Sequence, residues 1–362
     1  MNRPMRMSPT LALAEAVDRE RRNGREAYSF STPTFESLNP EILSRIRFRT
    51  TLTGSKGYGE LREAARELLF DKWRLSDHEC MISGGAKAAI FSILRACVEP
   101  GEKVLIISPH WPSYEDLATA AHLVPLSFAT SSETGFAIEP SKLRSALEQC
   151  GPKAVICSNP GNPTGRVLSR REVASLCEAT SNTGAVLLLD ESFSRIVFDR
   201  ERWTNSVCDA GSNVFVVNSF SKNFHLQGLR LGACMVPGEY FSAVASTHQT
   251  LLSSAPTLSQ DLALGILDSS DLPNCDYSFQ RQIVLEFLSS RGWRYSEPHG
   301  SFYVFPYVGG SDKIRDKLET GGIMTLPGCV FGSRYSEHLR ICFGKPLSEI
   351  NAILRLARIA LG

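Results

Sequence analysis

Four short apolar runs stand out in the middle of the chain, and segments of helical periodicity separate them. The runs cover residues 104–107, 154–157, 185–189 and 214–217, and each is apolar throughout instead of alternating with polar residues. Helices are predicted at residues 86–97, 112–121, 141–149 and 170–180. Short, continuously apolar strands with helices between them are typical of a mostly parallel sheet that is covered on both faces. The pattern therefore predicts an α/β unit with three αβα layers.

The pattern changes on either side of this unit. Helical periodicity covers residues 11–22, residues 240–268 with a break at Pro256, and residues 277–290. Apolar strands then alternate with helices towards the C-terminus, at residues 301–305, 323–326 and 339–343. This arrangement is typical of a smaller α+β unit.

The chain has 362 residues, which is more than one hydrophobic core usually spans. We therefore predict a large domain at residues 49–240, followed by an interdomain helix and a small domain at 241–362. The N-terminal segment, residues 1–48, is predicted to join the small domain.

The composition of the chain limits the kinds of molecule that the protein is expected to bind. The 39 Lys and Arg residues balance 38 Asp and Glu residues, and no basic stripe suggests a nucleic-acid surface. The ten cysteines are scattered without the spacing of a metal site or a disulfide framework. Because no apolar run reaches membrane-spanning length, we expect a cytoplasmic protein that binds small molecules or further copies of itself.

Polar segments follow the predicted strands, where ligands bind in a doubly wound sheet. Three residues at the start of the first predicted helix could cradle a phosphate with their backbone N–H groups, and three later residues could add hydroxyls and a cation. The first set is Gly84, Gly85 and Ala86, and the second is Ser219, Ser221 and Arg230.

Three further side chains at the same edge indicate what carries that phosphate. Asp190 could pair with a ring nitrogen, Trp111 could stack on a planar ring, and Lys222 could form an imine with an aldehyde. Pyridoxal 5′-phosphate (PLP) satisfies all of these requirements at once.

Each of these residues alone has a simpler interpretation. Asp190 could cap a helix, Trp111 could anchor a buried loop, and Asn162 could cap a turn in a segment rich in Pro, Gly and Asn. A single lysine usually lies at the surface. Arg340 is harder to explain in this way, because an arginine inside an apolar strand needs an anionic partner.

Taken together, three motifs resemble the class I/II aminotransferase family of PLP fold type I. They are Asn-Pro-Gly-Asn-Pro-Thr-Gly at 159–165, Asp-Glu at 190–191, and Ser-Phe-Ser-Lys at 219–222 with Arg230 eight residues after the lysine. The resemblance extends over residues 8–362 and implies a homodimer with sites at its interface.

The resemblance also implies a role for four residues. Lys222 carries the Schiff base and moves protons, and Asp190 holds the pyridine nitrogen. Asn162 bonds to the phenolic oxygen of the ring, and Arg340 takes the α-carboxylate of the substrate. The implied activity is PLP-dependent chemistry at the α-carbon of an α-amino acid, with transamination as the first hypothesis.

Two alternatives stay open. One is a PLP enzyme of the same fold that performs elimination with cyclisation, or oxidation, of an arginine-derived amino acid in specialised metabolism. The other is a binding or regulatory module, which the retention of Lys222, Asp190 and Arg340 disfavours. A dinucleotide dehydrogenase is disfavoured because no Gly-x-Gly-x-x-Gly follows a predicted strand.

Three positions depart from the family pattern. The tyrosine that usually donates to the phenolic oxygen is Phe193, and the tyrosine that usually reaches the partner subunit's phosphate is Leu52. The glycine of a Gly-x-Pro segment near the substrate is Ser31, which we include among the substrate-binding candidates. The segment Asp-Glu-Ser-Phe-Ser-Arg, 190–195, also resembles the arginine cyclases and oxidases.

The first departure generates a prediction. Without a donor to the phenolate, the Schiff base should keep its proton to higher pH. We expect Phe193→Tyr to lower the pKa that is read from the visible absorbance of the PLP-loaded protein. An unchanged titration would contradict the assignment of Phe193 to this position.

Overall fold

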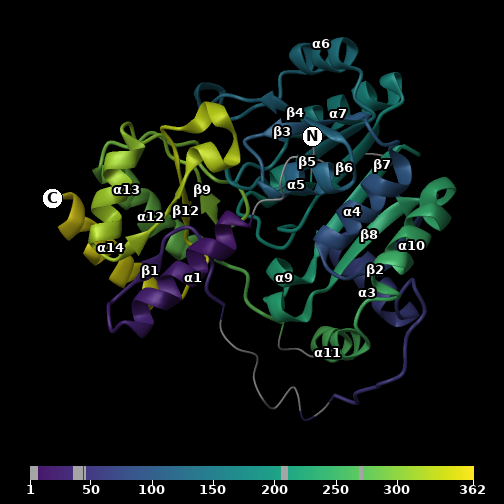
Figure 1. Ribbon diagram of the computed structural model, residues 1–362, viewed down its shortest axis with the longest axis horizontal. Coiled ribbons are helices and arrows are strands. Elements are labelled where there is room, and N and C mark those ends of the chain that lie inside the picture. The colour runs from purple at the N-terminus through teal and green to yellow at the C-terminus, as the bar shows by residue number, and fades with distance from the viewer. Residues whose placement is uncertain (1–6, 36–43, 45, 205–210, 269–271) are drawn as a thin grey trace.

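The computed structural model describes residues 7–35, 44, 46–204, 211–268 and 272–362. A seven-stranded sheet forms its larger part, in the order β2-β8-β7-β6-β5-β3-β4 (Figure 1). The strands are β2 His78–Ser83, β3 Lys103–Ser108, β4 Val124–Ala129, β5 Ala154–Ser158, β6 Val186–Asp190, β7 Val214–Ser219 and β8 Gly232–Pro237. Only β8 runs against the other six, so the prediction of a mostly parallel sheet is confirmed.

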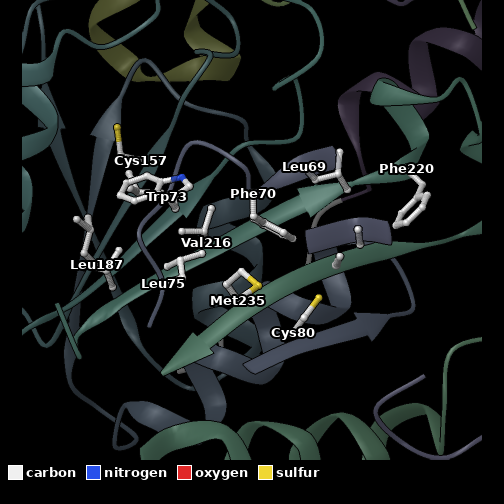
Figure 2. Close-up of a cluster of buried hydrophobic side chains, with 14 of the residues drawn as sticks. Leu69, Phe70, Trp73, Leu75, Cys80, Cys157, Leu187, Val216, Phe220 and Met235 are labelled. Carbon is white, nitrogen blue, oxygen red and sulfur yellow. The ribbon is translucent and has the colours of Figure 1, made fainter. Parts of the chain in front are cut away.

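Helices cover both faces of this sheet, as the continuous apolarity of its strands predicts. One face is covered by α3 Gly59–Leu69, α6 Pro140–Cys150, α7 Arg170–Thr183 and α11 Thr257–Leu267. The other face is covered by α4 Ala86–Cys97, α5 Ser113–Ala120 and α10 Gly238–Leu252. Figure 2 shows part of the first core, where Phe220 lies beyond the end of β7 and ties the short helix α9, Phe220–Asn223, to the sheet.

A smaller unit contains two short sheets. β1 Tyr28–Ser29 pairs in parallel with β10 Ile323–Met324, and the antiparallel strands β11 Leu326–Pro327, β12 Leu339–Cys342 and β9 Tyr303–Val304 form the second sheet. Its helices are α12 Ser278–Ser290, α13 Ser311–Thr320 and α14 Leu347–Leu361, with α1 Pro9–Arg22 beside them (Figure 1). The remaining elements are α8 Arg200–Thr204 and 3₁₀ turns at Ser132–Thr134, Gln227–Leu229, Gly328–Phe331 and Ser333–Tyr335.

The packing of α10 and α11 affects where the boundary between the two domains lies. Apolar residues of α10 and α11 lie in the two cores of the large sheet. We therefore propose that the large domain extends beyond residue 240 to include α10 and α11, and that the small domain begins after α11. Within the described part of the chain, no helix has the length and apolarity needed to cross a bilayer.

Candidate active site

Lys222 lies just beyond the carboxyl end of β7, in the single turn of α9. Ser219 begins this turn, and its hydroxyl accepts a hydrogen bond from the backbone N–H of Ser221 at 3.2 Å. The half-buried Lys222 side chain donates from Nζ to Gln227 Oε1 at 2.8 Å. The lysine is therefore held at the sheet edge by a local hydrogen-bonded turn.

The surroundings of Lys222 favour its neutral amine. Burial lowers the pKa of Lys222 to about 8, and the nearby cations Arg340 and Arg230 act in the same direction, whereas Cys342 opposes them. A neutral amine has the free electron pair that a nucleophile or a base requires. Lys222 can therefore act in either role close to neutral pH.

Aromatic side chains form a wall beside the amine. Lys222 Nζ lies 5.4 Å from the ring centre of Phe35 and 6.0 Å from that of Phe302. His225 stacks on Phe35 with 4.3 Å between the ring centres, and its Nε2 is hydrogen-bonded to the hydroxyl of Tyr277 at 2.9 Å. The stack fixes the N-terminal segment against the loop that follows Lys222.

Arg340 is a buried cation on β12 that reaches across to the large unit. Its Nη1 donates to Asn162 Oδ1 at 3.1 Å, and its Nη2 donates to the carbonyl oxygen of Ser31 at 2.7 Å. The guanidinium also lies over the rings of Tyr303 and Phe331, at 4.4 and 4.8 Å. Within the described residues its buried Nε has no hydrogen-bond partner. A buried guanidinium with an unused donor is suited to a carboxylate ligand.

The hydroxyl of Ser31, a substrate-binding candidate, is engaged within the protein. The Ser31 Oγ donates to the carbonyl oxygen of Arg340 and accepts from the backbone N–H of Leu326 at 3.0 Å. The hydroxyl is thus hydrogen-bonded to both β11 and β12. Ser31 positions Arg340 through its own carbonyl group and is not a direct ligand in this arrangement.

Asp190 ends β6 beside the end of β5, where it pairs in register with Ser158. Tyr114 donates to its Oδ2 at 2.5 Å, and the backbone N–H and hydroxyl of Ser192 donate to its Oδ1 at 3.0 and 2.6 Å. Burial raises the pKa of Asp190, although these hydrogen bonds oppose the rise. A cation placed at this carboxylate would favour the ionised form again.

Trp111 belongs to the same group of side chains. Its ring meets Tyr114 edge-on, with 5.5 Å between the ring centres and 88° between the planes. Tyr114 in turn bonds to Asp190. The side chains proposed for stacking on a ring and for holding its nitrogen are therefore linked through one tyrosine.

The start of α4 forms a close-packed cradle next to Arg230. Gly85 has φ +94°, and a Cβ atom there would lie 3.0 Å from Arg230 Nη2. Gly232 on β8 approaches the same turn, because a Cβ atom there would lie 2.7 Å from the nitrogen of Ala86. Gly84 donates its N–H to Nε2 of the buried His248 at 3.2 Å, so this N–H is already used. The unpaired N–H groups of the first α4 turn remain for an anion.

Sequence analysis missed Tyr114 and His248. Tyr114 lies in the first turn of α5, only three residues after the proposed stacking residue Trp111, and its backbone N–H donates to the carbonyl oxygen of Trp111 at 3.0 Å. This proximity in sequence could have drawn attention to it. His248 comes from α10 and carries no motif. Its contact with Gly84 depends on how α10 packs against α4.

Comparison with known proteins agrees with this geometry. The family model of aminotransferase class I and II matches residues 30–355. This match covers most of the chain. The chain belongs to the class I and II aminotransferase family.

Named relatives and solved structures are similar over nearly the whole chain. The aspartate/prephenate aminotransferase of Thermus thermophilus is 26% identical over 98% of this chain and 96% of its own length. A bifunctional aspartate and glutamate/aspartate-prephenate aminotransferase of Petunia hybrida is 29% identical over 91% of this chain and 75% of its own length. The structure of the aspartate aminotransferase of Thermus thermophilus with maleate superposes with a TM-score of 0.85 at 24% identity, covering 98% of this chain and 97% of that one. This likeness confirms PLP fold type I.

The aminotransferase is therefore a PLP-dependent transferase, and its residues fit the cofactor. The cradle at Gly85 and Arg230 has no room for a side chain, as a phosphate site at a helix N-terminus requires. Asp190 would hold the ring nitrogen, Trp111 would stack on the ring, and Lys222 would bind the aldehyde carbon. The cofactor supplies an electron sink for the bonds of the substrate α-carbon.

Phe193 and Leu52, two of the departures from the family pattern, lie in different surroundings. Phe193 is buried and packs edge-on against Phe302, with 5.2 Å between the ring centres and 89° between the planes. Leu52 is 76% exposed. Neither side chain has a hydroxyl, so the aminotransferase must bind the phenolic oxygen and the phosphate with other donors.

Proposed function

We propose that this aminotransferase moves an amino group from an α-amino acid to a 2-oxo acid, with the substrate α-carboxylate bound to Arg340. The observation that carries this proposal is the unused Nε donor of Arg340 in a buried site. Arg340 also lowers the pKa of Lys222, so the two groups share one electrostatic environment. A carboxylate bound to Arg340 would bring its α-carbon towards the amine of Lys222.

Each residue then has a distinct task. Arg340 and Asn162 would orient the substrate, and Lys222 Nζ, in its neutral form, would take the α-proton as general base and give it up again as general acid. Asp190 keeps a positive charge on the ring nitrogen by its own negative charge. The wall of Phe35 and Phe302 reduces the access of water to the amine.

The relatives named above support transamination, since all of them are named as aminotransferases. None of those names refers to elimination, cyclisation or oxidation. Aspartate is therefore the first amino donor to test, and 2-oxoglutarate is the first acceptor.

A transamination assay with an arginine variant tests this proposal. Arg340→Met should raise the KM for the amino donor about 100-fold or more, because a charge-assisted contact to the carboxylate is lost. Arg334→Met is the matched control, since Arg334 is exposed on the neighbouring segment and should leave KM unchanged. Products are followed by mass spectrometry.

Two outcomes would contradict the proposal. One is a wild-type product that retains its α-amino group or that forms only with oxygen. The other is an equal KM for Arg340→Met and for the wild type. The visible absorbance of PLP in the variant shows whether the cofactor site itself is intact.

We also infer that the aminotransferase forms a homodimer through the surface beside the phosphate cradle. Exposed leucines lie there, because Thr257 donates to the carbonyl oxygen of Thr51 at 2.9 Å, which brings the segments of Leu52 and Leu258 together, and Leu252 lies against Gly84 of the cradle. The leucines are Leu52, Leu251, Leu252 and Leu258. An exposed apolar patch of this kind is typical of an association surface.

Sedimentation velocity tests this association. The wild type should sediment as a dimer, and Leu258→Glu should shift it towards the monomer because a charge would be buried at the interface. A monomeric wild type would refute the inference.

We also propose a cytoplasmic location. The nine described cysteines are free thiols, which is typical of a reducing compartment. Fractionation of cells that express the tagged protein would test this location.

A further inference from the structure

Lys87 is a cation in an electrostatically unfavourable position. It is the second residue of α4, a helix whose first turn contains no acidic residue. The N-terminal end of a helix carries a partial positive charge, so a lysine there is repelled. The guanidinium of Arg230 lies next to Gly85, the residue that caps the N-terminus of this helix. Lys87, Arg230 and the N-terminal end of α4 therefore all contribute positive charge at the start of this helix.

The Lys87 side chain lies beside Trp111, the residue proposed to stack on the cofactor ring. It is half-buried, and its Nζ lies 5.0 Å from the ring centre of Trp111. No hydrogen bond or ion pair joins Lys87 to any residue in the described part of the chain. Burial lowers the pKa of Lys87, the carboxylate of Asp116 opposes this, and Arg230 lowers the pKa further.

A bound anion would remove this repulsion. The anion that the family places at the start of α4 is the phosphate of PLP, and the residues of this cradle fit it. The aminotransferase also lacks the usual second donor to that phosphate, because the tyrosine of the family pattern is replaced by the exposed Leu52. The unpaired cation Lys87 and the absence of the tyrosine hydroxyl thus concern the same phosphate cradle.

We infer that Lys87 is a ligand of the PLP phosphate and takes the place, within one subunit, of the donor that the partner tyrosine usually provides. The ammonium group contributes both a hydrogen bond and a full positive charge, which a tyrosine hydroxyl does not. The inference rests on PLP binding at this site and does not depend on which amino acid is the substrate.

The test compares the binding of PLP with that of pyridoxal, which has the same ring and aldehyde but no phosphate. Dissociation constants are measured by visible absorbance on the apo forms of the full chain. Lys87→Met should weaken PLP binding about tenfold or more, which is the usual effect of removing a charged hydrogen bond, and should leave pyridoxal binding unchanged. Lys87→Arg should keep most of the PLP affinity.

Matched variants separate a phosphate contact from a general effect. Lys56→Met removes another lysine that lies over an aromatic ring, Phe241 at 4.4 Å, and should change neither constant. Leu52→Tyr should increase PLP affinity more in the Lys87→Met background than in the wild type, because only there is a donor missing.

Several results would overturn the inference. Equal losses for PLP and pyridoxal would mean that Lys87 acts through Trp111 or through folding. Unchanged PLP binding with a raised KM for dicarboxylic amino donors would assign Lys87 to a substrate carboxylate instead. An equal gain from Leu52→Tyr in both backgrounds would refute the substitution of one donor for the other. A wild type that binds no PLP would instead refute the cofactor assignment.

Discussion

The burial of cationic side chains close to one another is the constraint on which this active site depends. Burial is the largest cause of the lowered pKa of Lys222, and Arg340 and Arg230 lower this pKa further, whereas Cys342 opposes them. The fold holds these groups together although Arg340 forms no ion pair with any described residue. Such an arrangement costs free energy until anions bind. The phosphate of PLP and the carboxylate of the substrate are the anions that offset this cost, so the site is selective for ligands with both.

The scaffold maintains this arrangement by close contact between distant elements. Gly232 lets β8 approach the start of α4, which places Arg230 against Gly85. Arg340 belongs to the small unit, whereas its partner Asn162 belongs to the large one. The substrate site is therefore complete only where the two units meet. A shift of either unit would alter the orientation of the guanidinium before it altered the cofactor site.

Much of this could be predicted from the sequence because motifs at strand ends specify their own location. Lys222, Asp190 and Asn162 follow strongly apolar strands, and those strands were recognisable. Three strands of the large sheet were missed. β2 begins with His78 and Glu79, β4 contains a proline at its second position, and β8 begins with glycine and ends with proline. Contacts between elements could not be predicted either: Tyr114, His248 and the inward carbonyl of Ser31 depend on packing that no local pattern encodes.

The central claim is that burial, assisted by two nearby cations, lowers the pKa of Lys222 to about 8, so that a usable fraction of its amine is neutral near physiological pH. The rate at which the apo protein takes up PLP, followed by stopped-flow absorbance across a pH series, measures this directly. The account predicts a rate that rises with pH to a midpoint near about 8, and a higher midpoint for Arg340→Met, which loses one of the cations. A wild-type midpoint at the ordinary lysine value of 10.5, or a midpoint that Arg340→Met leaves unchanged, would contradict it.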